Sequence, residues 1–219
     1  MPQTDTSSPD ALKPARDRPV FIHISKNAGT SLVASAGDRI VSAGHRTAEA
    51  WVAEHGRGAP IFAVIRNPFD RVASEYLYRK RRYESGERNP HLANLNKSFT
   101  DWVISTYRYD DFRTRSFFER TGIAYNPGNM IGDTLIWFIP QKKWLCGTDG
   151  TMLATELLRF ENLSEEWPAF AARHGFDAPL QHRNASRSGR TGEADYTPEI
   201  RAIIRDYFRE DFDFFGYPS

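Results

Sequence analysis

The stretch from Val20 to Ser31 constrains the fold of this chain more than any other segment. It opens with three apolar, β-favouring residues, Val20–Ile22, which predict a short strand. The residues that follow are small and polar, include Gly29, and lead into a segment that can begin a helix near Ser31. A strand, a glycine-containing loop and a helix in this order direct backbone N–H groups and the positive helix end at one point, which suits a phosphate.

The side chains of this loop add to its anion-binding character. Lys26 supplies a mobile cation, and Thr30 and Ser31 supply hydroxyl donors. The phosphate-binding loop of nucleotide triphosphatases has its lysine directly after the last glycine, whereas Lys26 stands before Gly29. The sequence therefore predicts a phosphate cradle of a different class. The alternative interpretation is an ordinary strand–turn–helix with a surface lysine.

The same alternation of strand and helix continues along the chain. Ile61–Ile65 is a continuous apolar run, as expected for a strand buried on both faces of a parallel sheet. Asn67-Pro68 ends this strand and starts a helix that extends to about Tyr83, and Thr47 is a suitable N-cap for an earlier helix. The pattern predicts a three-layer α/β fold, in which helices flank a central parallel sheet and connect its strands by right-handed crossovers.

Later segments carry weaker secondary-structure signals. Leu135–Ile139 is compatible with either a short strand or a buried helical turn, and the residues do not decide between them. The other expected elements are a helix capped by Ser98, a helix over 111–120, a short strand at 157–160, a helix capped by Ser164 and a helix opened by Thr197-Pro198.

Composition narrows the class of protein. The 219 residues suffice for one α/β domain, expected over residues 19–219, after a disordered N-terminal tail, residues 1–18, that lacks the apolar core of a secretion signal. With 29 basic and 28 acidic residues the net charge is +1, which indicates no nucleic-acid partner. No apolar run is long enough to cross a bilayer. The single cysteine, Cys146, fits a reducing, cytoplasmic compartment.

A second candidate anion site follows the predicted strand Ile61–Ile65. Arg66 lies just past the carboxyl end of this strand, where ligands of open α/β sheets bind. Its planar guanidinium suits bidentate contact with a phosphate, and Ser74, two helical turns further on, can contribute to the same anion. The structural alternative is an ion pair of Arg66 with Asp70 or Glu75.

His45 is the candidate general base. It stands in a loop before the Thr47 helix, and a neutral imidazole near the first loop can accept a proton from a substrate hydroxyl. A surface or capping histidine is the alternative. His23, in contrast, is expected inside the first strand as a hydrogen-bonded core residue.

Four adjacent cations, Arg79–Arg82, stand near the end of the helix that Pro68 opens. They wrap around the helix, so they cannot all face one ligand, and helix-dipole complementarity and solvation explain most of the cluster. Attraction of an anionic acceptor such as an acidic glycan is a further possibility.

Taken together, these segments resemble the sulfotransferase family, in particular its carbohydrate-type and small bacterial members. The first motif of that family, a strand followed by Pro-Lys-Thr/Ala-x-Gly-Thr-Ser, is similar to residues 23–31, with Ser25 in place of the proline and Asn27 in place of the threonine. The second, a strand followed by Arg-Asp/Asn-Pro-x-x-Arg-x-x-Ser, is matched by residues 65–74. A tail of the type Leu-x-His-x-Asn-x-Ser is matched by residues 180–186.

The resemblance implies a P-loop-NTPase-like sulfotransferase fold and transfer of a sulfuryl group from 3′-phosphoadenosine 5′-phosphosulfate, with 3′-phosphoadenosine 5′-phosphate as product and no metal. It implies that Arg66 and Ser74 hold the 3′-phosphate and that Asn184 and Ser186 contribute to donor binding from the tail. The loop residues that it assigns to the 5′-phosphosulfate are Lys26, Asn27, Ala28, Gly29, Thr30 and Ser31.

For catalysis, the resemblance implies that Lys26 stabilises the charge that develops during transfer and that His45 is the general base. Some relatives use a carboxylate instead, for which Glu49 and Glu54 are the substitutes. The expected acceptor is a hydroxyl group, on a carbohydrate or glycoconjugate. The alternatives are a nucleotide-binding protein of the same fold without transferase activity, and a nucleotide kinase or hydrolase.

Overall fold

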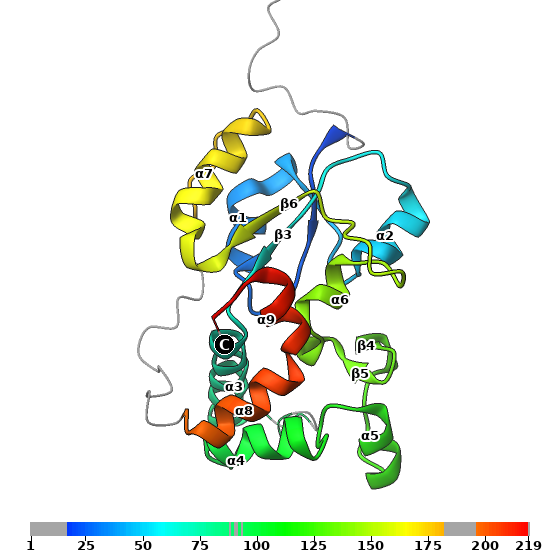
Figure 1. Ribbon diagram of the computed structural model, residues 1–219, viewed down its shortest axis with the longest axis vertical. Helices are drawn as coiled ribbons and strands as arrows, with labels where there is room; N and C mark the ends of the chain where they lie inside the picture. Colours follow the sequence, from blue (N-terminus) through cyan, green and yellow to red (C-terminus); the bar gives the residue numbers. More distant parts are fainter. Residues whose placement is uncertain (1–16, 88, 90–91, 93, 182–195, 219) are drawn as a thin grey trace, which may run out of the picture. The chain divides into compact units, whose positions relative to one another are not determined.

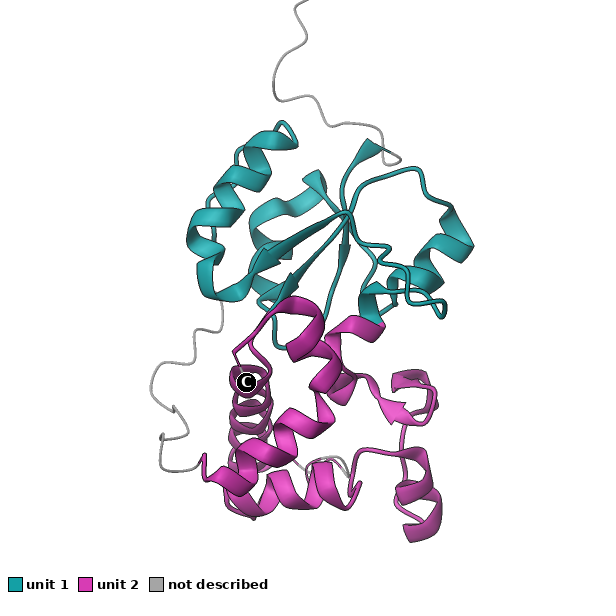
Figure 2. Ribbon diagram, viewed as in Figure 1, with its two compact units in different colours: residues 1–65, 144–185 teal, residues 66–143, 186–219 magenta. Residues whose placement is uncertain are grey.

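The computed structural model describes residues 17–87, 89, 92, 94–181 and 196–218. The chain forms two compact units, shown along the chain in Figure 1 and by colour in Figure 2. Unit 1 consists of residues 1–65 and 144–185, and unit 2 of residues 66–143 and 186–219. Each unit is therefore assembled from two separate stretches of sequence.

Unit 1 is built on a parallel four-stranded sheet with the strand order β2-β1-β3-β6. Val20 lies opposite Ile61 between β1 and β3, and Ile65 lies opposite Arg159 between β3 and β6. All residues of β1 and β3 are buried, so the strand predicted at Ile61–Ile65 is confirmed. The strands are β1 (Val20–Ile22), β2 (Val41–Ser42), β3 (Ile61–Ile65) and β6 (Glu156–Arg159).

Helices flank this sheet. Figure 1 shows α1 (Gly29–Ala36) and α7 (Leu163–Arg173) on one side and α2 (Ala48–His55) on the other. Aromatic side chains join α7 to the sheet: the ring centroids of Phe62 and Phe170 lie 4.3 Å apart. Burying such rings stabilises the unit because they remove a large apolar area from water. The α/β architecture with a central parallel sheet, predicted from the sequence, is confirmed.

Hydrogen bonds from helix N-caps confirm two predicted helix starts. Oγ1 of Thr47 accepts from the N–H of Ala50 at 3.1 Å. Asn67 caps α3 through its Oδ1. The predicted cap at Ser164 is wrong: α7 begins at Leu163 and continues directly from a 3₁₀ turn, so no side chain caps it.

Unit 2 is mostly helical, with one short antiparallel hairpin. The helix expected at 111–120 starts only at Arg115, and Leu135–Ile139 divides between the end of a strand and a 3₁₀ turn. The elements are α3 (Pro68–Glu84), α4 (Phe99–Val103) with a π-helical turn (Ile104–Arg108), α5 (Arg115–Thr121), β4 (Met130–Ile131), β5 (Thr134–Leu135), a 3₁₀ turn (Ile136–Phe138), α6 (Gln141–Leu145, which ends in unit 1), α8 (Pro198–Tyr207) and α9 (Arg209–Phe215).

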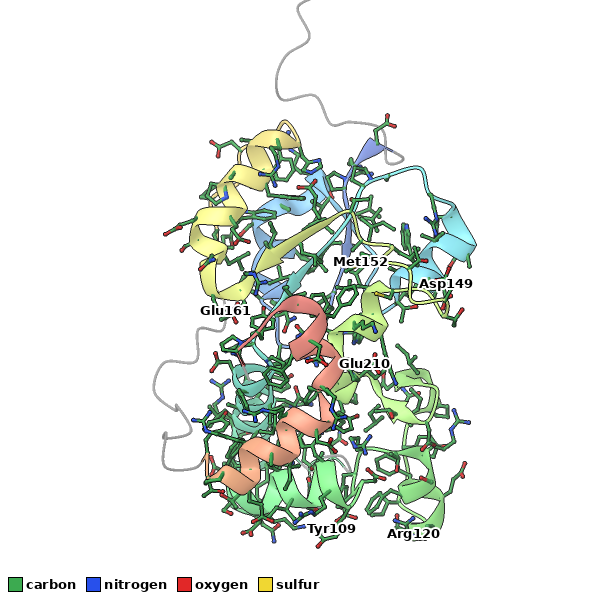
Figure 3. The ribbon with its side chains drawn as sticks, viewed as in Figure 1. Tyr109, Arg120, Asp149, Met152, Glu161 and Glu210 are labelled. Carbon is green, nitrogen blue, oxygen red and sulfur yellow. The ribbon has the colours of Figure 1, made fainter. Side chains whose placement is uncertain are left out.

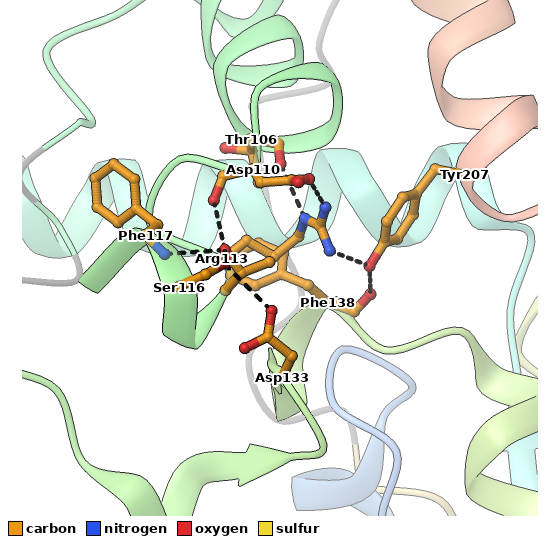
Figure 4. A network of polar contacts seen from close by, with 9 residues as sticks. Thr106, Asp110, Arg113, Ser116, Phe117, Asp133, Phe138 and Tyr207 are labelled. Atoms are coloured by element: carbon orange, nitrogen blue, oxygen red, sulfur yellow. Dashed lines mark hydrogen bonds and ion pairs between the residues drawn. The ribbon is translucent and has the colours of Figure 1, made fainter. Parts of the chain in front are cut away.

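A buried arginine, Arg113, connects several of these elements (Figure 4). Its Nε donates to the carbonyl oxygen of Thr106 at 3.0 Å, and its guanidinium donates to the hydroxyl of Tyr207 at 2.9 Å. That hydroxyl donates in turn to the carbonyl oxygen of Phe138 at 3.1 Å. Asp110 balances the charge of Arg113. The network fixes the π-helical turn, α8 and the 136–138 turn relative to one another.

Candidate active site

The Lys26 loop, Ser25–Ser31, joins β1 to α1 in unit 1. Lys26 (φ 67°) and Ala28 (φ 62°) both adopt the left-handed region, which residues with side chains rarely occupy. Each such residue costs about 1–3 kcal/mol unless the surroundings impose it, and such strain is concentrated at functional sites. Ala28 occupies the N-cap position of α1, and no side chain caps the helix there. The first N–H groups of α1 therefore have no side-chain cap, an arrangement that suits an anion.

A hydrogen bond from Asn27 connects the loop to the sheet. Its side chain is buried, and Nδ2 donates to the carbonyl oxygen of Val64 in β3 at 2.7 Å. This bond holds the side-chain amide of Asn27 against β3. Lys26 is half-buried and Thr30 is exposed, whereas Ser31 is buried.

Gly29 is required for close packing and not for an unusual backbone angle. A Cβ atom at this position would lie 2.0 Å from Cδ2 and Nε2 of the His23 ring, a separation that real atoms do not reach. Glycine alone therefore lets this ring lie against the start of α1. His23 follows the last residue of β1 and is half-buried, so its expected place inside the strand is wrong by one position.

His23 and His45 lie side by side. Their ring centroids are 4.7 Å apart. Burial, together with the smaller electrostatic effects of His45 and Lys26, lowers the pKa of His23 from 6.5 to about 4. His23 is therefore neutral at physiological pH. The electrostatic effect of both His45 and Lys26 on one ring also indicates that the two candidate catalytic groups lie close to His23.

A hydrogen bond to the backbone orients the exposed His45 ring. Nδ1 of His45 lies 3.1 Å from the carbonyl oxygen of His23. A carbonyl oxygen can only accept, so Nδ1 carries the hydrogen and Nε2 holds the lone pair in the neutral ring. The atom of His45 that can act as a base is thus Nε2.

The two carboxylates named as substitutes for His45 are held by other groups. Oε1 of Glu49 accepts from the N–H of Thr148 at 2.8 Å and from its hydroxyl at 3.0 Å. Glu54 forms an exposed ion pair with Arg46 at 2.6 Å. Asp149, labelled in Figure 3, lies in the turn that Glu49 contacts. It closes this turn by accepting from the N–H and the hydroxyl of Thr151. These contacts favour His45 over either carboxylate.

In unit 2, the backbone of Arg66 is held by a buried glutamine. Oε1 of Gln141 accepts from the N–H of Arg66, and Nε2 of Gln141 donates to the carbonyl oxygen of Arg66, both at 2.8 Å. Gln141 is held by Asp211, which accepts from the backbone N–H groups of Gln141 at 2.8 Å and Lys142 at 2.9 Å. Gln141 and Asp211 are both fully buried. Sequence reasoning missed both, because no local pattern connects residues so distant along the chain.

Buried charges support the same segment. Arg71 is 2% exposed and donates to the carbonyl oxygens of Ile139 at 2.9 Å and Trp137 at 3.3 Å. Glu75, one of the partners considered for Arg66, forms its ion pair with Arg79 instead. Ser74 lies on α3 and is half-buried.

Three further expectations concern the tail, a metal site and a membrane-spanning segment. Asn184 and Ser186 lie outside the described residues. Among the residues that the structure does describe, no cluster of three or more histidine, cysteine or acidic side chains could hold a metal ion. Within the same residues, no helix is both long and apolar enough to span a membrane.

Comparison with known proteins identifies the family. A family model described as "Sulfotransferase family" matches residues 58–218, well over half of the chain. This range contains Arg66 and Ser74, and it begins after the Lys26 loop and His45. No curated protein and no solved structure matches the chain. The α/β fold of the chain agrees with this match, and the chain belongs to the sulfotransferase family.

Proposed function

We propose that this protein transfers a sulfuryl group from 3′-phosphoadenosine 5′-phosphosulfate to a hydroxyl group, with a carbohydrate or glycoconjugate as the acceptor. Family membership supports sulfuryl transfer in general. One observation in unit 1 carries the assignment of residues: a left-handed, uncapped loop lies near a histidine whose hydrogen-bonded Nδ1 leaves Nε2 as the acceptor.

The residues present fit the donor. Its phosphosulfate is anionic and suits the backbone N–H groups of Gly29, Thr30 and Ser31 together with the cation of Lys26. In unit 2, Arg66 and Ser74 are assigned to the 3′-phosphate, because a guanidinium on a rigid backbone binds a phosphate bidentately. The donor supplies the activated sulfuryl group.

In the proposed reaction, Nε2 of His45 takes the proton that the acceptor hydroxyl loses as its oxygen bonds to sulfur. The bond between sulfur and the bridging phosphate oxygen breaks at the same time. Lys26 and the loop N–H groups stabilise the negative charge that grows on this leaving oxygen and on the sulfuryl oxygens. The nearby ring of His23 is neutral and adds no competing positive charge. Catalysis then rests on positioning and electrostatics.

Two measurements test the proposal. The first compares thermal stabilisation of the protein by 3′-phosphoadenosine 5′-phosphate with stabilisation by ATP and magnesium, and we expect the bisphosphate to raise the melting temperature more. The second follows transfer from labelled donor to a panel of glycans and small alcohols. Binding of the bisphosphate without any transfer would indicate a binding protein, and a preference for ATP with magnesium would reject the donor assignment.

The base is tested in the same transfer assay. We expect His45→Ala to lower turnover by about 10²–10⁴-fold, the usual contribution of a general base, while the bisphosphate still stabilises the protein. His55→Ala, at an exposed histidine of the same unit, is the matched control and should transfer at the wild-type rate. Wild-type turnover of His45→Ala would move the role of base to Glu49 or Glu54.

A further inference from the structure

Unit 2 contains a cavity of about 610 Å³. It lies along α3 from Glu75 to Arg82. The other lining residues are Asn89, Leu92, Ala124, Tyr125, Asn126, Asn129 and Trp137. Its volume falls within the range of small-molecule sites, about 300–1,000 Å³. No residue assigned to the donor or to the base lines it.

A carboxylate of this cavity has an unused oxygen. Glu75 is 2% exposed, and its Oε1 accepts from Nε of the buried Arg79. Its Oε2 is buried and has no hydrogen-bond partner among the described residues. Because a buried polar atom without a partner is unfavourable, a ligand that brings a hydroxyl or amide donor to Oε2 is favoured.

Aromatic rings form much of the remaining lining. Tyr125 stacks on Phe118, with centroids 5.2 Å apart and planes at 21°. The guanidinium of Arg79 lies 5.1 Å from the centroid of Trp137. Tyr78 is 38% exposed on α3. Rings that neighbours hold in place present flat apolar surface to a ligand at little entropic cost.

The charges of the cavity are largely balanced. Arg79 pairs with Glu75, and Arg82 pairs with Glu87. A site with compensated cations offers little to a phosphate group and favours a neutral, hydroxyl-rich ligand. The lining also includes amide groups, which both donate and accept hydrogen bonds, from Asn89, Asn126 and Asn129.

We propose that this cavity binds a saccharide, with the aromatic rings against the C–H faces of the sugar and Glu75 and the asparagines on its hydroxyl groups. A role in recruiting a glycan acceptor rests on the proposed sulfuryl transfer, whereas the binding itself does not. The cavity therefore indicates that the acceptor is a saccharide, and this indication does not depend on the catalytic residues.

The test is saturation-transfer NMR of the full chain with lactose, cellobiose, maltose, N,N′-diacetylchitobiose and an unsulfated chondroitin disaccharide. We expect at least one of them to bind, and we expect Tyr78→Ala and Tyr125→Ala to weaken its binding by about three- to tenfold each, the usual effect of losing an aromatic contact. Tyr109→Ala is the matched control: Tyr109, labelled in Figure 3, is 62% exposed and belongs to the same unit, and it does not line the cavity. Glu75→Gln, which replaces an oxygen acceptor, should act in the same direction, with thermal melting as the check on folding.

The outcomes separate this inference from the proposed function. Failure of all five saccharides to bind the wild-type protein, or equal binding by the Tyr78→Ala, Tyr125→Ala and Tyr109→Ala proteins, would overturn it. Saccharide binding without sulfuryl transfer would support the cavity and reject the transferase. Transfer to small alcohols without saccharide binding would support the transferase and reject the saccharide site.

Discussion

The Lys26 loop of unit 1 and the Arg66 segment of unit 2 both present a cation, but they are held in place in different ways. The loop depends on two left-handed residues, one glycine and one hydrogen bond from Asn27. The Arg66 segment depends on buried polar side chains that come from distant parts of the chain, Gln141 and Asp211. The first arrangement concentrates strain at the loop, and the second concentrates desolvated charge behind it. Changes to the loop should therefore affect turnover most, and changes behind Arg66 should affect folding most.

Removal of the Asp211 carboxylate should have the largest effect. Asp211→Ala removes the acceptor for two backbone N–H groups and one of the carboxylates, beside Glu75, that stabilise the buried cation of Arg71. Breaking a buried charge interaction on one side costs about 3–5 kcal/mol of unfolding free energy, which urea denaturation measures. Asp213→Ala, an exposed position on the same helix, should change this free energy by less than about 0.5 kcal/mol. Equal stability of the two variants would remove the contrast between the two segments.

Truncation of Lys26 should produce the opposite pattern. We expect Lys26→Ala to lower kcat by about 10²–10³-fold, as the loss of one transition-state donor does elsewhere, with little change in unfolding free energy, because the side chain is half-exposed. Steady-state kinetics and urea denaturation of the same preparation check both parts. Lys143→Ala, at an exposed lysine, serves as the control. A Lys26→Ala protein with normal turnover would contradict the role of the loop.

A methyl group at Gly29 should affect both properties moderately. Gly29→Ala forces the His23 ring away from the start of α1, and overpacking of this kind costs about 1–3 kcal/mol. His45 is bonded to the carbonyl oxygen of His23, so turnover should fall together with stability. Gly58→Ala is the matched control, since an added Cβ there has no neighbour within 4 Å. Retention of wild-type stability and turnover in Gly29→Ala would show that this packing is not needed.

The last prediction concerns the pH dependence of stability. The pKa of His23 is lowered from 6.5 to about 4 by burial and by the charges of His45 and Lys26. The unfolded chain therefore takes up a proton below pH 6.5, whereas the folded chain takes it up only near pH 4. The contribution of neutral His23 to the free energy of unfolding is complete above pH 6.5, and it is lost as the pH falls towards 4. His23→Asn should reduce this loss in urea denaturation across that range. If the free energy of unfolding changed equally with pH in the wild-type and His23→Asn proteins, the lowered pKa of His23 would be disproved.

The sequence predicted those features that depend on neighbouring residues. The apolar run at Ile61–Ile65 predicted a strand that is buried on both faces, and the structure confirms this strand. The caps Thr47 and Thr197 predicted helix starts that the structure also confirms. Each is a local signal, since a cap residue hydrogen-bonds within its own first turn. The antiparallel hairpin β4–β5 was missed because its strands are only two residues long.

At the candidate site, residue types could be predicted, but their backbone geometry could not. The sequence showed that the loop contains Gly29, yet the left-handed residues are Lys26 and Ala28. Glycine is needed at position 29 because the His23 ring lies against it, a contact that depends on how the loop folds back after β1. The hydrogen bonds by which Gln141 and Asp211 support Arg66 could not be predicted either, because they depend on tertiary packing.

The pairing of β3 with β6 has a consequence for the order of folding during synthesis. Ile65 and Arg159 are neighbours in the sheet, yet the whole segment 66–143 of unit 2 is made between them. On the ribosome, the sheet of unit 1 must wait with an open β3 edge until β6 emerges, and unit 2 must wait for α8 and α9. Because such long-range pairings are slow and expose strand edges, we expect the nascent chain to be most vulnerable to aggregation while residues 66–155 are being synthesised.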